Sequence, residues 1–168
     1  IEIEPNIIHY RILTIDKDSE CRWLVSGNFY AVNGHETAFI ARLNPDFSVD
    51  TTYVSGLKYV FSVPEPHVVL MDSQDRLWLT HGNYMVAQND PLDTVDVLRL
   101  LPSGAVDTTF VPRHTAAEYP PGSVPHASWA GNLIGGLELS PERYMLYGMF
   151  NYWNDTLQNC ITVVDDAG

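Results

Sequence analysis

One segment of this chain recurs at a fixed distance, and that recurrence constrains the fold more than any other feature. Residues 41–53 read ARLNPDFSVDTTY, and residues 98–110 read LRLLPSGAVDTTF. Arg42 and Arg99 are 99 − 42 = 57 residues apart, and Asp50 and Asp107 are 107 − 50 = 57 residues apart. A third copy begins at residues 161–168 with ITVVDDAG. Repeats at such a spacing indicate a stacked or radial array of similar units.

Three glycines, Gly27, Gly82 and Gly148, mark the same register in each copy. An aromatic residue stands four positions before each glycine and another two positions after it: Trp23 and Phe29, Trp78 and Tyr84, Tyr144 and Phe150. We therefore expect three repeats, at about 8–53, 68–110 and 134–168, the third of them truncated. The segment 111–132 interrupts the register and is predicted to be a loop insertion.

Each repeat is predicted to consist of short strands, because β-branched and aromatic residues alternate between polar turns. The first strands are expected at 11–15, 68–71 and 134–139, the second at 22–26, 77–81 and 143–147, and the third at 39–43, 95–100 and 160–164. Asn33-Gly34 predicts a type I′ turn, and Asn89-Asp90 and Asn154-Asp155 are weaker versions of it. No ten-residue stretch keeps a helical period. The sequence predicts an all-β chain with about three propeller-like antiparallel sheet repeats of at most four strands each.

Composition excludes several classes of function. The formal net charge is −12 and only Lys17 and Lys58 are lysines, so nucleic-acid binding is not expected. No run of 18 apolar residues occurs, so no membrane span is expected. Cys21 and Cys160 form no paired motif, and we expect two buried free thiols. The sequence begins at Ile1 and shows no basic, apolar leader, which suggests a processed or excised piece.

The repeat pattern resembles the delta-sixty repeat family of bacterial surface and phage virion proteins. The residues that carry the resemblance in the first copy are Gly27, Phe29, Asn33, Gly34, Ala41, Arg42, Leu43, Asn44, Val49, Asp50 and Tyr53. The second copy retains Gly82, Tyr84, Asn89, Arg99, Leu100, Val106, Asp107 and Phe110, whereas Val163 replaces the arginine in the third. The resemblance implies a β-propeller-like fold, no common catalytic set, and interaction roles on a virion or cell surface.

The recurrent Asp50 and Asp107 each precede Thr-Thr and an aromatic residue. They could form a metal or acid site, but a recurring Asp before Thr favours a structural turn cap, in which the carboxylate accepts hydrogen bonds from the backbone two residues on. Asp16, Asp18 and Glu20 lack the glycine and glutamate that an EF-hand loop requires. The six histidines show no metal-ligand spacing, and no nucleophile motif occurs. We expect no metal, no cofactor and no enzymatic activity.

The best candidates for ligand or partner binding are aromatic residues and a histidine in predicted loops. They are Tyr119, His126 and Trp129 in the insertion, and Tyr152 and Trp153 in the third repeat. Exposed aromatic rings on loops suit sugars or protein partners. Alternatively, these side chains fold back over an incomplete core.

Two functions are compatible with these observations. The first is a non-catalytic structural and interaction module of a larger virion protein, such as a phage tail or tail fibre, or of a cell-surface protein. Its partners would be other subunits or the remainder of the same polypeptide, and a surface glycan. The second is a fragment of a propeller-fold glycan-processing enzyme, which would need inward-facing carboxylates at equivalent positions. Because about three repeats do not close a ring, we also expect apolar faces and unpaired strand edges at both ends of the array.

Overall fold

The fold is known from a computed structural model that describes residues 2–5, 11–37, 39–57, 67–86, 94–111, 115–116, 132–153 and 156–168. Every regular element in these ranges is a β-strand. The prediction of an all-β chain with antiparallel sheet repeats is therefore confirmed. Within the same ranges, the structure contains no helix that is long and apolar enough to cross a membrane.

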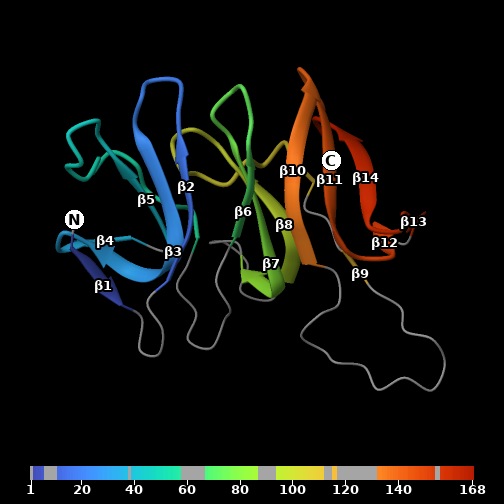
Figure 1. The fold of residues 1–168 in the computed structure, drawn as a ribbon, viewed down its shortest axis with the longest axis horizontal. Coiled ribbons are helices and arrows are strands. Elements are labelled where there is room, and N and C mark those ends of the chain that lie inside the picture. The colour runs from blue at the N-terminus through green and yellow to red at the C-terminus, as the bar shows by residue number, and fades with distance from the viewer. Residues whose placement is uncertain are drawn as a thin grey trace.

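Three sheets of similar construction stand side by side (Figure 1). In each, a central strand pairs antiparallel with one strand before it and one after it. The first sheet is built on β2 (Arg11–Lys17), β3 (Trp23–Val32) and β5 (Ile40–Leu43). The second contains β6 (His67–Met71), β7 (Leu77–Val86) and β8 (Thr94–Leu100). The third contains β10 (Asn132–Ser140), β11 (Arg143–Met149) and β14 (Ile161–Asp165).

The first sheet has five strands rather than the expected maximum of four. Because β3 is 10 residues long, its second half also pairs with β1 (Ile3–Pro5) and β4 (His35–Glu36). Asn33 and Gly34 join β3 to β4 with φ angles of 48° and 77°, as the predicted type I′ turn requires. The pairs Asn89-Asp90 and Asn154-Asp155 lie outside the described residues.

A separate small sheet lies beside the third sheet. It contains β9 (Thr115–Ala116), β12 (Tyr152–Trp153) and β13 (Thr156–Leu157), with β12 in the middle. Because β9 pairs with β12, the segment that follows the second sheet lies beside the third repeat. The small sheet therefore connects two repeats that are separated by the long insertion.

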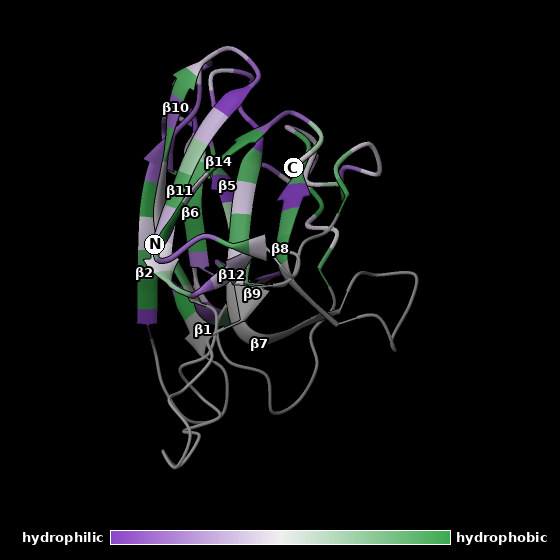
Figure 2. Cartoon of the chain, turned by 90° about the vertical axis from the view of Figure 1, so that its right-hand side faces the viewer, coloured by the Kyte–Doolittle hydropathy of each residue, from purple (hydrophilic) through white to green (hydrophobic). Residues whose placement is uncertain are grey.

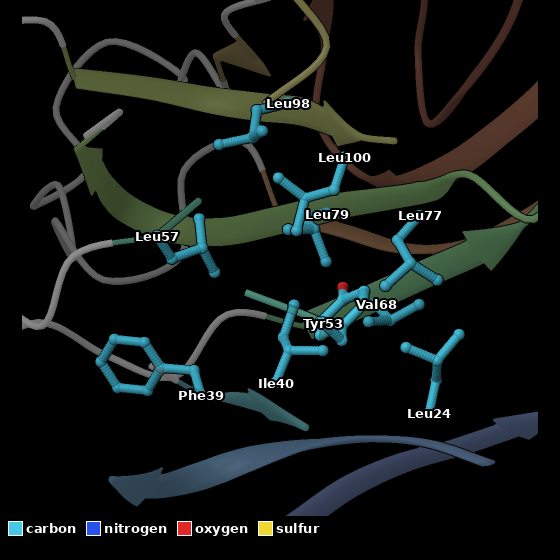
Figure 3. Close-up of a cluster of buried hydrophobic side chains, with 10 residues drawn as sticks. All are labelled: Leu24, Phe39, Ile40, Tyr53, Leu57, Val68, Leu77, Leu79, Leu98 and Leu100. Carbon is cyan, nitrogen blue, oxygen red and sulfur yellow. The ribbon is translucent and has the colours of Figure 1, made fainter. Parts of the chain in front are cut away.

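Two apolar cores hold the three main sheets together. The first seam, between the first and second sheets, contains Leu24, Phe39, Ile40, Tyr53, Leu57, Val68, Leu77, Leu79, Leu98 and Leu100 (Figure 3). The second seam, between the second and third sheets, contains Val69, Trp78, Val97, Phe110, Leu133, Tyr144, Leu146, Phe150, Trp153 and Val164. The second sheet thus buries both of its faces, one against each neighbour, and burial of this apolar surface is the main favourable contribution to the array.

The aromatic residues that precede the register glycines do not occupy equivalent places. Leu24 lies opposite Arg42 and Trp78 lies opposite Arg99, so Leu24, and not Trp23, is the structural counterpart of Trp78. A one-residue difference in register turns a side chain to the other face of its sheet. Trp78 consequently points from the second sheet towards the third, and Tyr144 points from the third sheet towards the second. Their rings meet in the second seam with centroids 4.5 Å apart.

The two cysteines are both free and exposed, which corrects the expectation that they are buried. Cys21 lies in the turn between β2 and β3, and Cys160 lies in the turn that precedes β14. Both have positive φ angles, of 63° and 70°. Their position in tight surface turns, where side chains point away from the seams, accounts for the exposure.

Candidate functional site

Asp50 and Asp107 make the same hydrogen bonds to a threonine in the turns that follow the first and second sheets. Oδ1 of Asp107 accepts hydrogen bonds from the backbone N–H of Thr109 at 2.9 Å and from its Oγ1 at 2.6 Å. Oδ1 of Asp50 accepts the corresponding bonds from Thr52 at the same two distances, 2.9 and 2.6 Å. The two carboxylates therefore form Asx turns, and neither Oδ1 is left without a donor.

The second carboxylate oxygen of each aspartate binds the recurrent arginine. Nε of Arg42 donates to Oδ2 of Asp50 at 2.8 Å, and Nε of Arg99 donates to Oδ2 of Asp107 at 2.7 Å. Burial would raise the pKa of both aspartates, but the threonine and arginine hydrogen bonds outweigh it and hold each pKa below its ordinary value. Both carboxylates are thus ionised and fully engaged, which does not suit a metal ligand or a catalytic acid.

Each recurrent arginine also reaches across a seam to the next sheet. The guanidinium of Arg42 lies 4.9 Å from the ring centroid of Tyr53, and its Nη1 donates to the carbonyl of Pro102 at 2.7 Å. The guanidinium of Arg99 lies 5.1 Å from the ring of Phe110. Its Nη1 donates to Oδ1 of Asp166 at 2.9 Å. The arginines therefore connect successive repeats by a repeated contact.

Asp166 joins several groups at the second seam. Besides Arg99, its Oδ1 accepts from Nη2 of Arg76 at 2.7 Å and from the hydroxyl of Tyr144 at 3.2 Å. Burial would raise the pKa of Asp166, but the two arginines keep it below its ordinary value. Burial also raises the pKa of Tyr144 to about 12, so its hydroxyl stays protonated and donates. These contacts make Asp166 a structural centre of the seam.

A second repeated motif escaped the sequence analysis. Residues 18–22 read DSECR and residues 72–76 read DSQDR, with the same spacing of 72 − 18 = 54 and 76 − 22 = 54. Asp18 and Asp72 are both buried, and each carboxylate accepts from the backbone and Nε of the arginine four residues on, Arg22 or Arg76. The signal was present as a recurrent Asp-Ser-x-x-Arg, but alignment on the glycines concealed it because it shifts the repeats by one residue.

The serine of this motif forms a further link between sheets. Ser19 donates its N–H and its hydroxyl to the carboxylate of Asp75 at 2.9 and 2.5 Å. Ser73 donates in the same way to the carboxylate of Glu138, both at 2.7 Å. The turn between β2 and β3 and the turn between β6 and β7 are therefore each held by an acidic side chain of the next repeat.

Of the five predicted binding residues, only Tyr152 and Trp153 lie in the described part of the chain. Tyr119, His126 and Trp129 lie outside the described residues. Trp153 is only 7% exposed and packs in the second seam, where its ring lies 6.3 Å from that of Phe150. For Trp153 the structure shows the alternative arrangement, in which the side chain folds back over the core, because this ring lies between the second and third sheets. Its neighbour Tyr152 is half-buried.

The strongest candidate for an interaction surface is the sheet face that points away from the second seam. We call this the outer face of the third sheet, formed by Leu137, Met145, Tyr147, Ile161 and Val163. Met145 lies between Leu137 and Val163, and Tyr147 pairs with Ile161. The side chains of Leu137, Tyr147, Ile161 and Val163 are 53%, 42%, 48% and 48% exposed. Figure 2 views the molecule from this side and shows apolar residues along β14.

The expected apolar surface is also present at the opposite end of the array, where Ile15 and Phe47 of the first sheet are 60% and 51% exposed, although their neighbours are covered. On the first sheet, the rings of Trp23 and Phe47 stack at 6.1 Å with an interplanar angle of 15°. Val25 and Leu43 belong to the same cluster and are only 8% and 2% exposed. Within the described residues, the first-sheet end is therefore partly covered, and the third-sheet end exposes more large apolar side chains.

Comparison with known proteins identifies one repeat. Residues 22–53 match the model of a family described as domain of unknown function (DUF5122) beta-propeller. This stretch contains β3, β5 and the Asp50 turn of the first sheet. Searches of curated proteins and of solved structures gave no match. The match supports a β-propeller-like family, in agreement with the fold, and does not extend to the more specific delta-sixty repeat family.

Proposed function

We propose that this chain is a non-catalytic structural and interaction module of a larger virion or cell-surface assembly. The observation that carries the proposal is the outer face of the third sheet, where four large apolar side chains from three adjacent strands are each at least 42% exposed. Contiguous apolar patches on a folded surface mark sites where another protein binds, because their burial is favourable.

The use of the recurrent charged residues supports a non-catalytic role. A propeller enzyme would carry free carboxylates at equivalent positions that face one site. Here Asp50 and Asp107 each bind a threonine and an arginine, and Asp18 and Asp72 each bind an arginine. Among the described residues, no group of three or more histidine, cysteine or acidic side chains could hold a metal ion. These repeated carboxylates thus serve turns and ion pairs within each repeat, and Arg42 and Arg99 make the contacts that cross the seams.

The virion or cell-surface setting, with a phage tail or tail fibre as the favoured case, rests on the sequence resemblance to the delta-sixty repeat family. The net charge of −12 favours solubility and opposes contact with nucleic acid. We propose that the insertion at residues 111–132, with Tyr119, His126 and Trp129, provides a second contact to a partner or a surface glycan. Long loops on a rigid β scaffold are well placed for this role.

A glycan array read for both binding and cleavage tests this function. We expect the full chain to retain at least one glycan without releasing products. Trp129→Ala should reduce that signal, and Val54→Ala, at an exposed position with 65% exposure, should leave it unchanged. Release of a shortened glycan would contradict the proposal and favour the glycan-processing alternative. Absence of binding to every glycan would contradict the glycan role of the insertion.

A further inference from the structure

The outer face of the third sheet belongs to a series whose other members are covered. In the first sheet, the pair Leu24 and Arg42 faces the second sheet; in the second, the pair Trp78 and Arg99 faces the third. Met145 and Val163 form the corresponding pair of the third sheet. Inside the chain, the surface that covers this position is in both cases another apolar β-sheet. The same kind of surface is therefore suited to the third face.

The outer face of the third sheet has Val163 where the other two faces have Arg42 and Arg99, and this difference limits the chemistry of its partner. Arg42 and Arg99 each need an oxygen on the covering sheet, and they find it at Pro102 and Asp166. Val163 has no such requirement. A partner for this face must therefore offer apolar side chains at the corresponding position, because a carboxylate buried against Val163 would lose its hydration without gaining a donor.

Tyr147 makes the outer face broad and level. A Cβ atom added to Gly135 would lie 2.3 Å from the hydroxyl of Tyr147 and 2.6 Å from Cζ of its ring. The ring therefore lies across the neighbouring strand, over the space that the glycine leaves. A level apolar sheet face is suited to packing against a second sheet, in which two layers lie about 10 Å apart.

The first sheet of another copy is a poor partner for this face. At the seams within the chain, the turn after the third strand lies against the preceding repeat, and a Cβ at Gly104 would come within 2.5 Å of the Val54 carbonyl oxygen. Phe47 occupies the matching position of the first sheet, with φ of 65° against 90° at Gly104, and its ring stacks on Trp23. A head-to-tail contact of the same geometry would have to displace Phe47.

We infer that the outer face of the third sheet is a docking surface for the same face of a second copy of this chain. The two third sheets pack face to face about a two-fold axis, which gives a closed dimer. Arg143 and Asp165 lie opposite each other at one end of this face, so each copy brings one charge of either sign to the rim. The inference rests on the proposed interaction role and deepens it by naming the partner.

Light scattering coupled to size-exclusion chromatography, with the full chain over a range of concentrations, tests the inference. We expect the mass to rise from 18.9 kDa for one chain to that of two chains and to stop there. Because each chain carries −12 charges, added salt should leave pairing unchanged or strengthen it, as the apolar contact persists while repulsion is screened.

Substitutions at exposed positions locate the contact. Val163→Asp should weaken the dimer by about tenfold or more, because it places an unpaired carboxylate in an apolar interface. Ile15→Asp is the matched control: it also replaces an exposed branched residue, 60% exposed, but on the first sheet at the other end of the array, and should leave the dimer unchanged. Val163→Thr retains the side-chain shape and should weaken the dimer less. Circular dichroism and thermal melts establish that each variant is folded.

Three results would overturn the inference. A mass of one chain at every concentration would show that the face has no affinity for itself. Growth beyond two chains would indicate a head-to-tail contact. A dimer that is unaffected by Val163→Asp, in a folded protein, would place the contact elsewhere. None of these measurements depends on a glycan or another protein, so failure here is distinguishable from failure of the proposed function on the glycan array.

Discussion

Arg99 in the second sheet and Asp166 after the third sheet are joined by a 2.9 Å ion pair between Nη1 and Oδ1. The arginine side chain is fully buried, whereas that of Asp166 is 35% exposed. Asp166 also receives Arg76 at 2.7 Å, so a single carboxylate links two arginines of one sheet to the turn of the next. At the first seam, the equivalent Arg42 finds a backbone carbonyl, that of Pro102. The second seam therefore depends on charge in a way that the first does not.

Asp166→Asn should destabilise the fold by about 1–2 kcal/mol, because it removes a charge that two largely buried arginines share, while the partial exposure of Asp166 screens the effect. Urea unfolding measures the change in free energy. Asp165→Asn is the matched control, since it removes the neighbouring charge at an exposed position and should stay within about 0.5 kcal/mol of wild type. Equal effects of the two substitutions would contradict a special role for Asp166.

Stability should decline in acid, and the pKa shifts give the sign. Burial would raise the pKa of Asp107 and Asp166, but threonine or arginine hydrogen bonds hold each below its ordinary value of 3.8. A lowered carboxylate pKa contributes stability that is fully present above the unfolded value and is lost as the pH falls through the folded value. We expect the free energy of unfolding to start falling at about pH 5 and to keep falling below pH 4.

Asp16 acts in the opposite direction, since burial raises its pKa, so a comparison with a variant is more informative than the wild-type curve alone. Asp166→Asn lacks one of the lowered groups, and its curve of unfolding free energy against pH should be shallower below pH 4 than that of wild type. Denaturant melts at a series of pH values provide both curves. Parallel curves would show that Asp166 has the same pKa in the folded and unfolded states.

Much of the fold was accessible from the sequence because its signals are local. The expected strands at 77–81 and 143–147 lie within β7 and β11, since alternating side chains and polar turns determine strands over a few residues. The sequence did not reveal on which face of its sheet each side chain lies. Alignment on the glycines equated Trp23 with Trp78, although cross-strand partners show that they lie on opposite faces, and only pairing reveals this difference.

The candidate site shows the same division. The turns at Asp50 and Asp107 could be predicted because their hydrogen bonds span two residues. The ion pair between Arg99 and Asp166 spans 67 residues, and no local pattern specifies such a contact. The burial of Trp153 depends on the packing of the second seam, which likewise cannot be seen along the chain. The roles of Tyr119, His126 and Trp129 stay predictions.

Asp107 should stabilise the fold both as a turn cap and as an ion-pair partner, and two substitutions separate these roles. Asp107→Ala removes both and should cost about 1–3 kcal/mol or more, since it leaves the Thr109 N–H without its acceptor. Asp107→Asn retains an acceptor for that N–H but loses the charge beside Arg99, so its cost should be smaller. Asp50→Ala should act in the same direction, because Asp50 makes the corresponding bonds to Thr52 and to Nε of Arg42. Thermal and urea melts test the order, and a wild-type melt for Asp107→Ala would refute the turn role.

Gly104 should tolerate no side chain, because the preceding repeat approaches it closely. Its φ of 90° already disfavours any other residue, and an added Cβ would lie 2.5 Å from the backbone oxygen of Val54. Gly104→Ala should therefore combine backbone strain with opening of the first seam, and we expect a loss of about 2–4 kcal/mol in unfolding free energy.

Gly34→Ala is the control that isolates this contact. Gly34 also has a positive φ, of 77°, but no atom lies within 4 Å of an added Cβ. Its substitution should cost only the strain of the left-handed backbone, about 1–2 kcal/mol. The difference between the two variants in urea unfolding measures the approach of Val54 to Gly104. If both alanine variants lost the same stability, the close contact of Val54 with Gly104 would contribute nothing. The presence of Phe47 at the matching position of the first sheet could then not be explained by the lack of a preceding repeat there.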